Sequence, residues 1–320
     1  MIVLAGAEFF TNSVEWLGKK LNLGAGAVGS IFAAVGTALP ETIIPIIAIV
    51  SNGRGSSGHD IGIGAILGAP FMLATLAMLV TGIAAMIKRK GNTLMNIIPD
   101  VMRRDMQFFL IVFTVAILAS FLPIWPLKLV VGVFLVCAYA YYVYKTIKTS
   151  IGSHDEDEIL KPLIFKRKSE NPTFVPVIIQ LIVSLAIIIA GADLFVGSVQ
   201  AVATIFGTPV LILSLIITPI ATELPEKFNS VIWVSHGKDT LALGNITGAM
   251  VFQSSLIPAI GIVLTDWKLE PIALISAALA LGAILFQFIC LTVKHSLKPS
   301  YLFVGGLFYL VFIAFIIFRG

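Results

Sequence analysis

The stretch TALPE at residues 37–41 returns as TELPE at residues 222–226. The same offset of 185 residues places GAEFFTNSV (6–14) over GADLFVGSV (191–199) without a gap. After a five-residue difference in the next loop, GAILGA in the first half lies over GNITGA at 244–249, and the paired glycines of these elements favour close helix packing. Three matches in the same order predict that the chain is a duplication of one unit.

The apolar composition of the chain predicts that most of it lies in a lipid bilayer. Of the 320 residues, 58% are hydrophobic and 12% are charged, whereas an ordinary soluble domain carries charge on about a quarter of its residues. A membrane-spanning helix needs about 20 mainly apolar residues. We therefore expect an all-α membrane protein with ten transmembrane helices. The expected spans cover residues 2–18, 23–50, 60–87, 106–122, 126–146, 174–204, 208–235, 240–264, 270–293 and 299–318.

Each copy of the duplication holds five of these spans. An odd number of crossings makes the second copy enter the membrane from the opposite side, so we expect two inverted five-helix repeats. The repeats are predicted at residues 1–146 and 174–320, with a linker at 147–173. Such repeats are typical of secondary transporters and place the binding site at the repeat interface, near the bilayer midplane. A duplication that serves only as scaffold is the alternative.

The distribution of positive charge predicts the orientation of the chain. Most of the 21 Lys and Arg residues fall in the loops after the first, third, fifth, seventh and ninth spans, which share one side. An excess of Lys and Arg marks cytoplasmic loops. We therefore expect a multi-pass protein of the cell membrane, with a solvated cytoplasmic linker and both termini outside.

Two glutamates, Glu41 and Glu226, lie near the middle of long apolar spans. A charged side chain at that depth costs roughly 3 kcal/mol or more, so it marks a functional site by default. Each glutamate follows a proline, and a proline inside a helix removes the hydrogen bond to the carbonyl four residues earlier. The carbonyls of Gly36 and Ala221 are therefore expected to be available as ligands.

Hydroxyl groups are predicted beside both glutamates. Thr37 and Thr222 stand four residues before Glu41 and Glu226, which puts hydroxyl and carboxylate on one helix face. Carboxylates, hydroxyls and carbonyls together form an all-oxygen cage, which suits a hard cation such as Ca²⁺. Glu41 and Glu226 are the expected metal ligands, since two carboxylates balance a divalent charge. A pair of kinked helices with protonated structural glutamates is the alternative.

The paired Leu-Pro-Glu motifs, each preceded by threonine and followed by a glycine-rich element, resemble the two alpha repeats of the calcium/cation antiporter superfamily. The resemblance covers essentially the whole chain and implies the ten-helix sodium/calcium exchanger fold. It implies exchange of Ca²⁺ for Na⁺ or H⁺ by alternating access, with the first and sixth helices sliding past a fixed core. It also implies that Glu41, Glu226, Thr37 and Thr222 are the central cation ligands.

The chain departs from the family pattern at several positions. The usual Thr-Ser-Leu-Pro-Glu has alanine in the first copy and Glu223 in the second. A polar or acidic position one turn after the family's Gly-Ser-Asn element is Leu73 in one copy and Gln253 in the other. Several oxygens that hold Na⁺ in sodium-coupled members are therefore missing. We count Glu223 and Gln253 among the cation-binding candidates and favour H⁺ over Na⁺ as the counter-ion. An ion pair between Glu223 and Lys227 is the alternative.

The residues within the predicted spans limit the functions and the partners that the chain can have. We expect transported inorganic cations and the lipid bilayer as partners, with no cofactor and no nucleic acid, and a monomeric assembly is left open. A membrane-embedded enzyme would need a nucleophile–base pair, a di-aspartate or a metal triad, and the spans hold none of these. Within transport, a Na⁺/H⁺ type antiporter that does not carry Ca²⁺ is the main alternative.

Overall fold

The computed structural model describes residues 2–20, 39–51, 56–89, 91, 93–150, 161–166 and 171–319. Within these ranges all regular secondary structure is helical, which confirms the predicted all-α class. The first part of the chain forms α1 (Ile2–Lys20), α4 (Leu39–Ser51), α5 (Ser56–Met72), the π-helix η2 (Leu73–Ala77), α6 (Met78–Lys88), α7 (Pro99–Leu118), the 3₁₀ turn η3 (Ala119–Phe121) and α8 (Trp125–Ser150).

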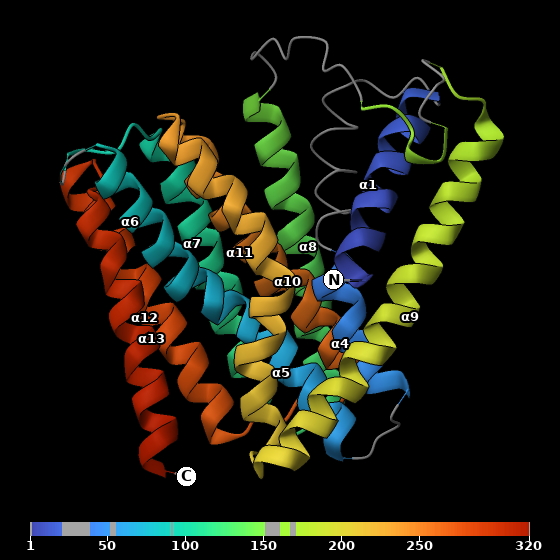
Figure 1. Cartoon of the computed structure of the whole chain (residues 1–320). Coiled ribbons are helices and arrows are strands. Elements are labelled where there is room, and N and C mark those ends of the chain that lie inside the picture. Colours follow the sequence, from blue (N-terminus) through green and yellow to red (C-terminus); the bar gives the residue numbers. More distant parts are fainter. Residues whose placement is uncertain are drawn as a thin grey trace.

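The second part of the chain continues the helical pattern. It forms the 3₁₀ turn η4 (Ile164–Lys166), α9 (Phe174–Phe206), α10 (Val210–Ser235), α11 (Asp239–Leu264), α12 (Pro271–Lys294) and α13 (Pro299–Arg319). Helices α7 and α12 both begin with proline, whose missing N–H is not needed in a first turn. Figure 1 shows α9 to α13 running beside the helices of the first part.

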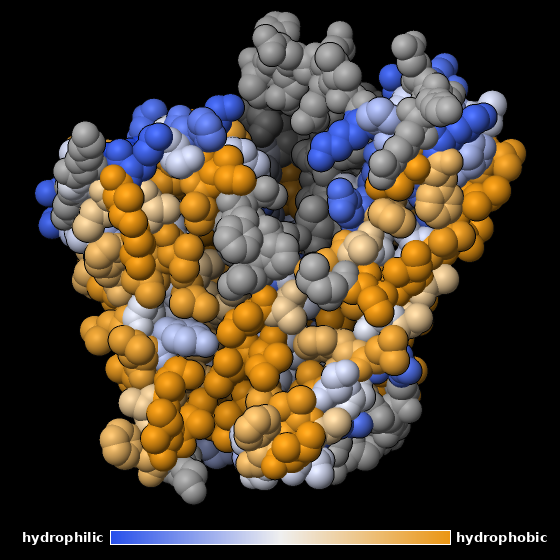
Figure 2. Space-filling model, viewed as in Figure 1, coloured by the Kyte–Doolittle hydropathy of each residue, from blue (hydrophilic) through white to orange (hydrophobic). Residues whose placement is uncertain are grey.

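The long helices carry the apolar surface that a membrane protein needs. In the described part of the chain, seven helical stretches are long and apolar enough to cross a membrane, and three shorter apolar helices accompany them. In the apolar 18-residue window of Gly58–Lys88, 83% of the residues are buried, whereas only 22% are buried in the corresponding windows of α8 and α13. Helix α5 therefore lies centrally, and α8 and α13 present apolar faces outward. Figure 2 shows apolar residues over most of the visible face, below a hydrophilic upper rim.

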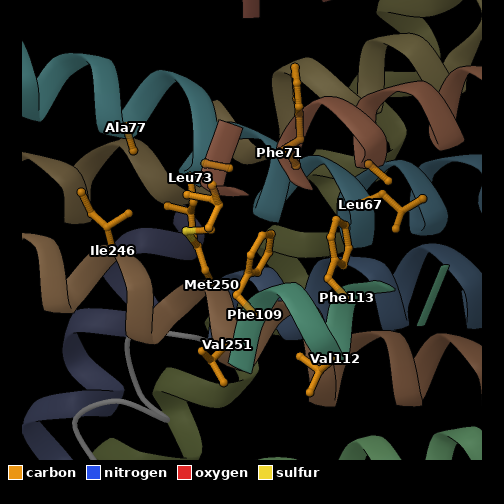
Figure 3. Packing of buried hydrophobic residues seen from close by; sticks show 14 of the residues in the cluster. Leu67, Phe71, Leu73, Ala77, Phe109, Val112, Phe113, Ile246, Met250 and Val251 are labelled. Atoms are coloured by element: carbon orange, nitrogen blue, oxygen red, sulfur yellow. The ribbon is translucent and has the colours of Figure 1, made fainter. Parts of the chain in front are cut away.

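The main hydrophobic core joins helices from both parts of the chain. Figure 3 shows residues of α5, η2, α7 and α11 packed together, among them Phe71, Phe109, Phe113 and Met250. These four side chains are fully buried. Since α11 lies between helices of the first part, neither half of the chain buries its core alone.

Helices α1 and α9 form a close pair beside this core (Figure 1). A Cβ atom on Gly6 would lie 2.8 Å from Cγ1 of Ile188, and one on Gly191 would lie 2.9 Å from Cγ2 of Val3. Only glycine therefore fits at either position without a shift of the neighbouring helix. Gly6 matches Gly191 in the duplication, and Val3 matches Ile188, so the two contacts are each other's counterparts.

Helices α5 and α10 approach each other equally closely. A Cβ atom on Gly64 would lie 2.7 Å from Cβ of Ser214, and one on Gly68 would lie within 3.0 Å of the backbone of Leu215. The predicted close packing is thus present at both glycines of the first copy. This contact fixes α10, which carries the predicted site residues Thr222, Glu223 and Glu226, against α5.

The predicted start of the fourth span, at residue 106, is wrong by seven residues. Helix α7 begins at Pro99 and includes a run of charged residues that the sequence pattern assigns to a loop. Asp105 is buried because Arg104 and Thr247 satisfy its carboxylate at 2.9 Å each. Because the charge of Asp105 has its partners within the protein, it can be buried inside the helix and does not have to lie in a loop.

Residues 161–166 of the predicted solvated linker are anchored to α1 and α9, although most of their side chains are exposed. Asn12 and Trp16 of α1 donate side-chain hydrogen bonds to backbone carbonyls of this segment, Trp16 at 2.9 Å. Asn12 and Gln180 of α9 accept hydrogen bonds from its backbone N–H groups at 3.1 and 2.9 Å. The side chain of Leu163 is fully buried beside Trp16. These partners satisfy backbone groups of the segment and hold it against α1 and α9.

Candidate cation-binding site

Glu41 is carried into the protein interior by α4. Its side chain is only 5% exposed, and the preceding Pro40 is also buried. Helix α4 packs against α5, α9 and α11, so residues of both halves surround it. Burial of this carboxylate confirms that the sequence motif points inward rather than to lipid.

Helix α10 brings a second carboxylate and a hydroxyl to the interior. The side chains of Thr222 and Glu223 are 3% and 0% exposed. Thr222 Oγ1 donates to the carbonyl oxygen of Thr218 at 3.2 Å. Helix α10 continues through Pro225, which has no N–H to offer the carbonyl of Ala221. That this carbonyl serves a cation stays a prediction.

Gln253 of α11 joins the two carboxylates. Its amide nitrogen Nε2 donates to Oε1 of Glu41 at 3.5 Å and makes a short hydrogen bond with Oε1 of Glu223. The side chain of Gln253 is 1% exposed. The structure therefore brings together three of the predicted cation-binding residues, one each from α4, α10 and α11.

The cluster brings two buried carboxylates close to each other. Two unit charges 4 Å apart repel each other by about 4 kcal/mol at an effective dielectric constant of 20. The amide of Gln253 is neutral, so it orients the carboxylates of Glu41 and Glu223 without balancing their charge. A cation or a proton is what such a pair of buried carboxylates can bind.

Several predicted site residues lie outside the described part of the chain. Gly36 and Thr37 belong to residues 21–38, which the structure does not describe. The backbone of α10 is described at Glu226 and Lys227, but their side chains are not. Among the described residues, no group of three or more His, Cys, Asp or Glu side chains is placed to hold a metal ion. The Glu41–Glu226 pair and the Glu223–Lys227 ion pair both stay predictions.

Two further hydroxyls near the site were not predicted. Ser214 and Thr218 lie two turns and one turn before Thr222 on α10, and both are fully or almost fully buried. Ser214 Oγ donates to the carbonyl of Ile61 at 2.8 Å and lies 3.1 Å from Oγ1 of Thr218. The sequence signal was available, since hydroxyls recur at a spacing of four residues in an otherwise apolar span.

The first copy has no polar counterpart to Gln253. Leu73 occupies that position, is fully buried, and begins the π-helix η2. A π-helical turn widens the helix and is frequent at functional sites. The candidate site is therefore asymmetric, with its amide contributed by the second half alone.

Comparison with known proteins gives consistent matches. Residues 1–148 and 176–320 match the family described as sodium/calcium exchanger protein. The putative antiporter CaxA of Alkalimonas amylolytica is 25% identical over 276 residues, which cover 85% of this chain and 81% of the relative. The inner membrane protein YrbG of Escherichia coli is 24% identical over 295 residues, which cover 91% of this chain and 86% of the relative.

Solved structures show the same fold. The crystal structure of the H⁺/Ca²⁺ exchanger CAX superposes with a TM-score of 0.71 at 16% identity, over 100% of this chain and 80% of that chain. The sodium-calcium exchanger NCX_Mj superposes with a TM-score of 0.59 at 19% identity, over 98% of this chain and 94% of that chain. With its helical spans and a family match over most of its length, this integral membrane protein belongs to the sodium/calcium exchanger protein family, a family of cation transporters.

Proposed function

We propose that this protein is a secondary active antiporter that exchanges Ca²⁺ for H⁺ or Na⁺ across the cell membrane. The observation that carries the proposal is the buried contact of Gln253 with Glu41 and Glu223. Carboxylate and amide oxygens are ligands that Ca²⁺ prefers. The Glu226 carboxylate and the Thr37 and Thr222 hydroxyls would complete the cage.

Transport would proceed by alternating access between two inverted repeats of five helices each. The contacts at Gly6 and Gly191 support this symmetry. Gly6 contacts Ile188 and Gly191 contacts Val3, and an offset of 185 residues converts one contact into the other. Reciprocal contacts of this kind are what a two-fold relation between equivalent elements produces. The close pair α1–α9 is the part expected to move relative to the core around α5 and α10.

The counter-ion would be H⁺ rather than Na⁺. Leu73 offers no oxygen where sodium-coupled relatives present one, and Gln253 offers no negative charge. Glu223 adds a carboxylate next to Glu41, and this additional group would carry the exchanged proton. The linker at 147–173 would face the cytoplasm and both termini the outside, as the Lys and Arg distribution indicates.

Replacement of Glu41 tests the proposal. Glu41→Gln keeps the size of the side chain but removes one charge, so a divalent ion is no longer compensated in the low-dielectric interior. We expect Ca²⁺ uptake into proteoliposomes to fall at least a hundredfold, measured with ⁴⁵Ca²⁺ under separately imposed H⁺ and Na⁺ gradients. Protein yield and elution volume on gel filtration should stay unchanged.

Glu270→Gln is the matched control, since Glu270 is exposed at the start of α12 and the chemical change is the same. It should transport Ca²⁺ like the wild type. Normal Ca²⁺ uptake by Glu41→Gln would show that the cage is wrongly assigned. Wild-type protein that exchanges Na⁺ for H⁺ and ignores Ca²⁺ would establish the alternative antiporter.

A further inference from the structure

The amide of Gln253 uses only one of its two ends in the contacts described above. Nε2 donates to both carboxylates, whereas Oε1 is buried and has no hydrogen-bond partner in the described part of the chain. The assignment of the two ends follows from charge, because an amide oxygen facing two carboxylate oxygens would be repelled by both. Among the described residues, this acceptor beside two carboxylates therefore makes no hydrogen bond.

A cation between the carboxylates changes what the amide must do. The N–H groups of Gln253 point at the oxygens that would hold the cation, and an amide nitrogen is not a ligand for hard cations. The amide oxygen is such a ligand. The terminal torsion of a glutamine is soft and roughly two-fold, so a half-turn exchanges the two ends without moving α11.

We propose that Gln253 is a two-position amide at the centre of the site. In one position its amino group ties Glu41 of α4 to Glu223 of α10, and in the other its oxygen coordinates the transported cation. Gln253 thereby competes with the cation for the same two carboxylates and then becomes one of its ligands. This inference rests on the proposed function, because the cation must bind at Glu41 and Glu223.

Infrared difference spectroscopy tests the half-turn directly. Protein labelled with ¹³C at the side-chain amide carbon of glutamine is compared with and without added CaCl₂. A coordinated amide carbonyl should absorb at lower wavenumber, so Ca²⁺ should shift one ¹³C-glutamine band. Gln253→Leu should abolish this band, whereas the control Gln107→Leu, at an exposed position on α7, should keep it.

The same spectra separate the inference from the proposed function. Ca²⁺-induced carboxylate bands without any glutamine band would overturn the two-position amide but leave a Ca²⁺ site at the glutamates. The absence of all Ca²⁺-induced bands would overturn the proposed function itself.

A second variant covers the case in which leucine disturbs folding. Gln253→Glu keeps the size and an oxygen at this position but has no amide to turn. It should bind Ca²⁺ at least tenfold more tightly than Gln253→Leu, measured by isothermal titration calorimetry. Equal affinities would show that no oxygen at position 253 reaches the cation.

Discussion

Glu223 shows how the role of a single residue depends on its neighbours. In the sequence, Lys227 stands one turn later and offers an ion pair as the simplest role for this carboxylate. In the structure, Glu223 is fully buried and bonded to Gln253, the residue that also contacts Glu41. A carboxylate in that position belongs to the candidate site.

Replacement of Glu223 separates binding from coupling. Glu223→Gln removes the additional carboxylate but leaves Glu41 and Glu226 to hold the divalent ion. Because Glu41 and Glu226 still balance the divalent charge, we expect Ca²⁺ binding to weaken less than it does in Glu41→Gln, while the stimulation of ⁴⁵Ca²⁺ flux by an imposed pH gradient falls at least fivefold. Glu8→Gln, an exposed position on α1, is the matched control. A variant that keeps the full response to the pH gradient would contradict proton coupling through Glu223.

At the scale of the helices, periodicity and composition predicted most boundaries within a few residues. The sequence could not predict where α7 begins, because the partners of Asp105 come from its neighbour Arg104 and from Thr247, far along the chain. It also could not predict that Gln253 donates to both Glu41 and Glu223. The family resemblance identifies Gln253 as a site position, but it does not say which groups the side chain contacts. Glu41 and Thr222 are buried, as a polar group within an apolar span must be if it is not to face lipid, but their role as cation ligands stays a prediction.

Glycine substitutions test the helix contacts. Gly68→Ala would place a methyl group against the backbone of Leu215 on α10, and forced overpacking costs about 1–3 kcal/mol. A Cβ atom on Gly197 of α9 would meet nothing within 4 Å, and alanine favours a helix by about 1 kcal/mol over glycine. In detergent, Gly68→Ala should lower the Tm, and Gly197→Ala should leave it unchanged or raise it. The reverse order would refute the close α5–α10 contact.

At the scale of the whole molecule, two groups of packed helices, here called bodies, each draw on both halves of the chain. Helices α1 and α9, one from each half, pack together beside α4. The larger body is built on α5, α7, α11 and α12, again from both halves. Each half therefore contributes to both bodies, and the candidate site residues come from α4, α10 and α11. Motion between the bodies would change the surroundings of the site from both sides.

The segment 161–166 joins the two halves of the chain, because it precedes α9 in the sequence and is hydrogen-bonded to α1. Its backbone is bonded by Asn12 and Trp16, which belong to the first half, as well as by Gln180 of the second. Two separate polypeptides, 1–150 and 161–320, should therefore reassemble when they are co-expressed, and should co-purify through a tag on one of them. Adding Asn12→Leu should reduce the recovered partner severalfold, because it leaves backbone groups of the segment without partners. Recovery that is indifferent to Asn12 would mean that the helices alone hold the fragments together.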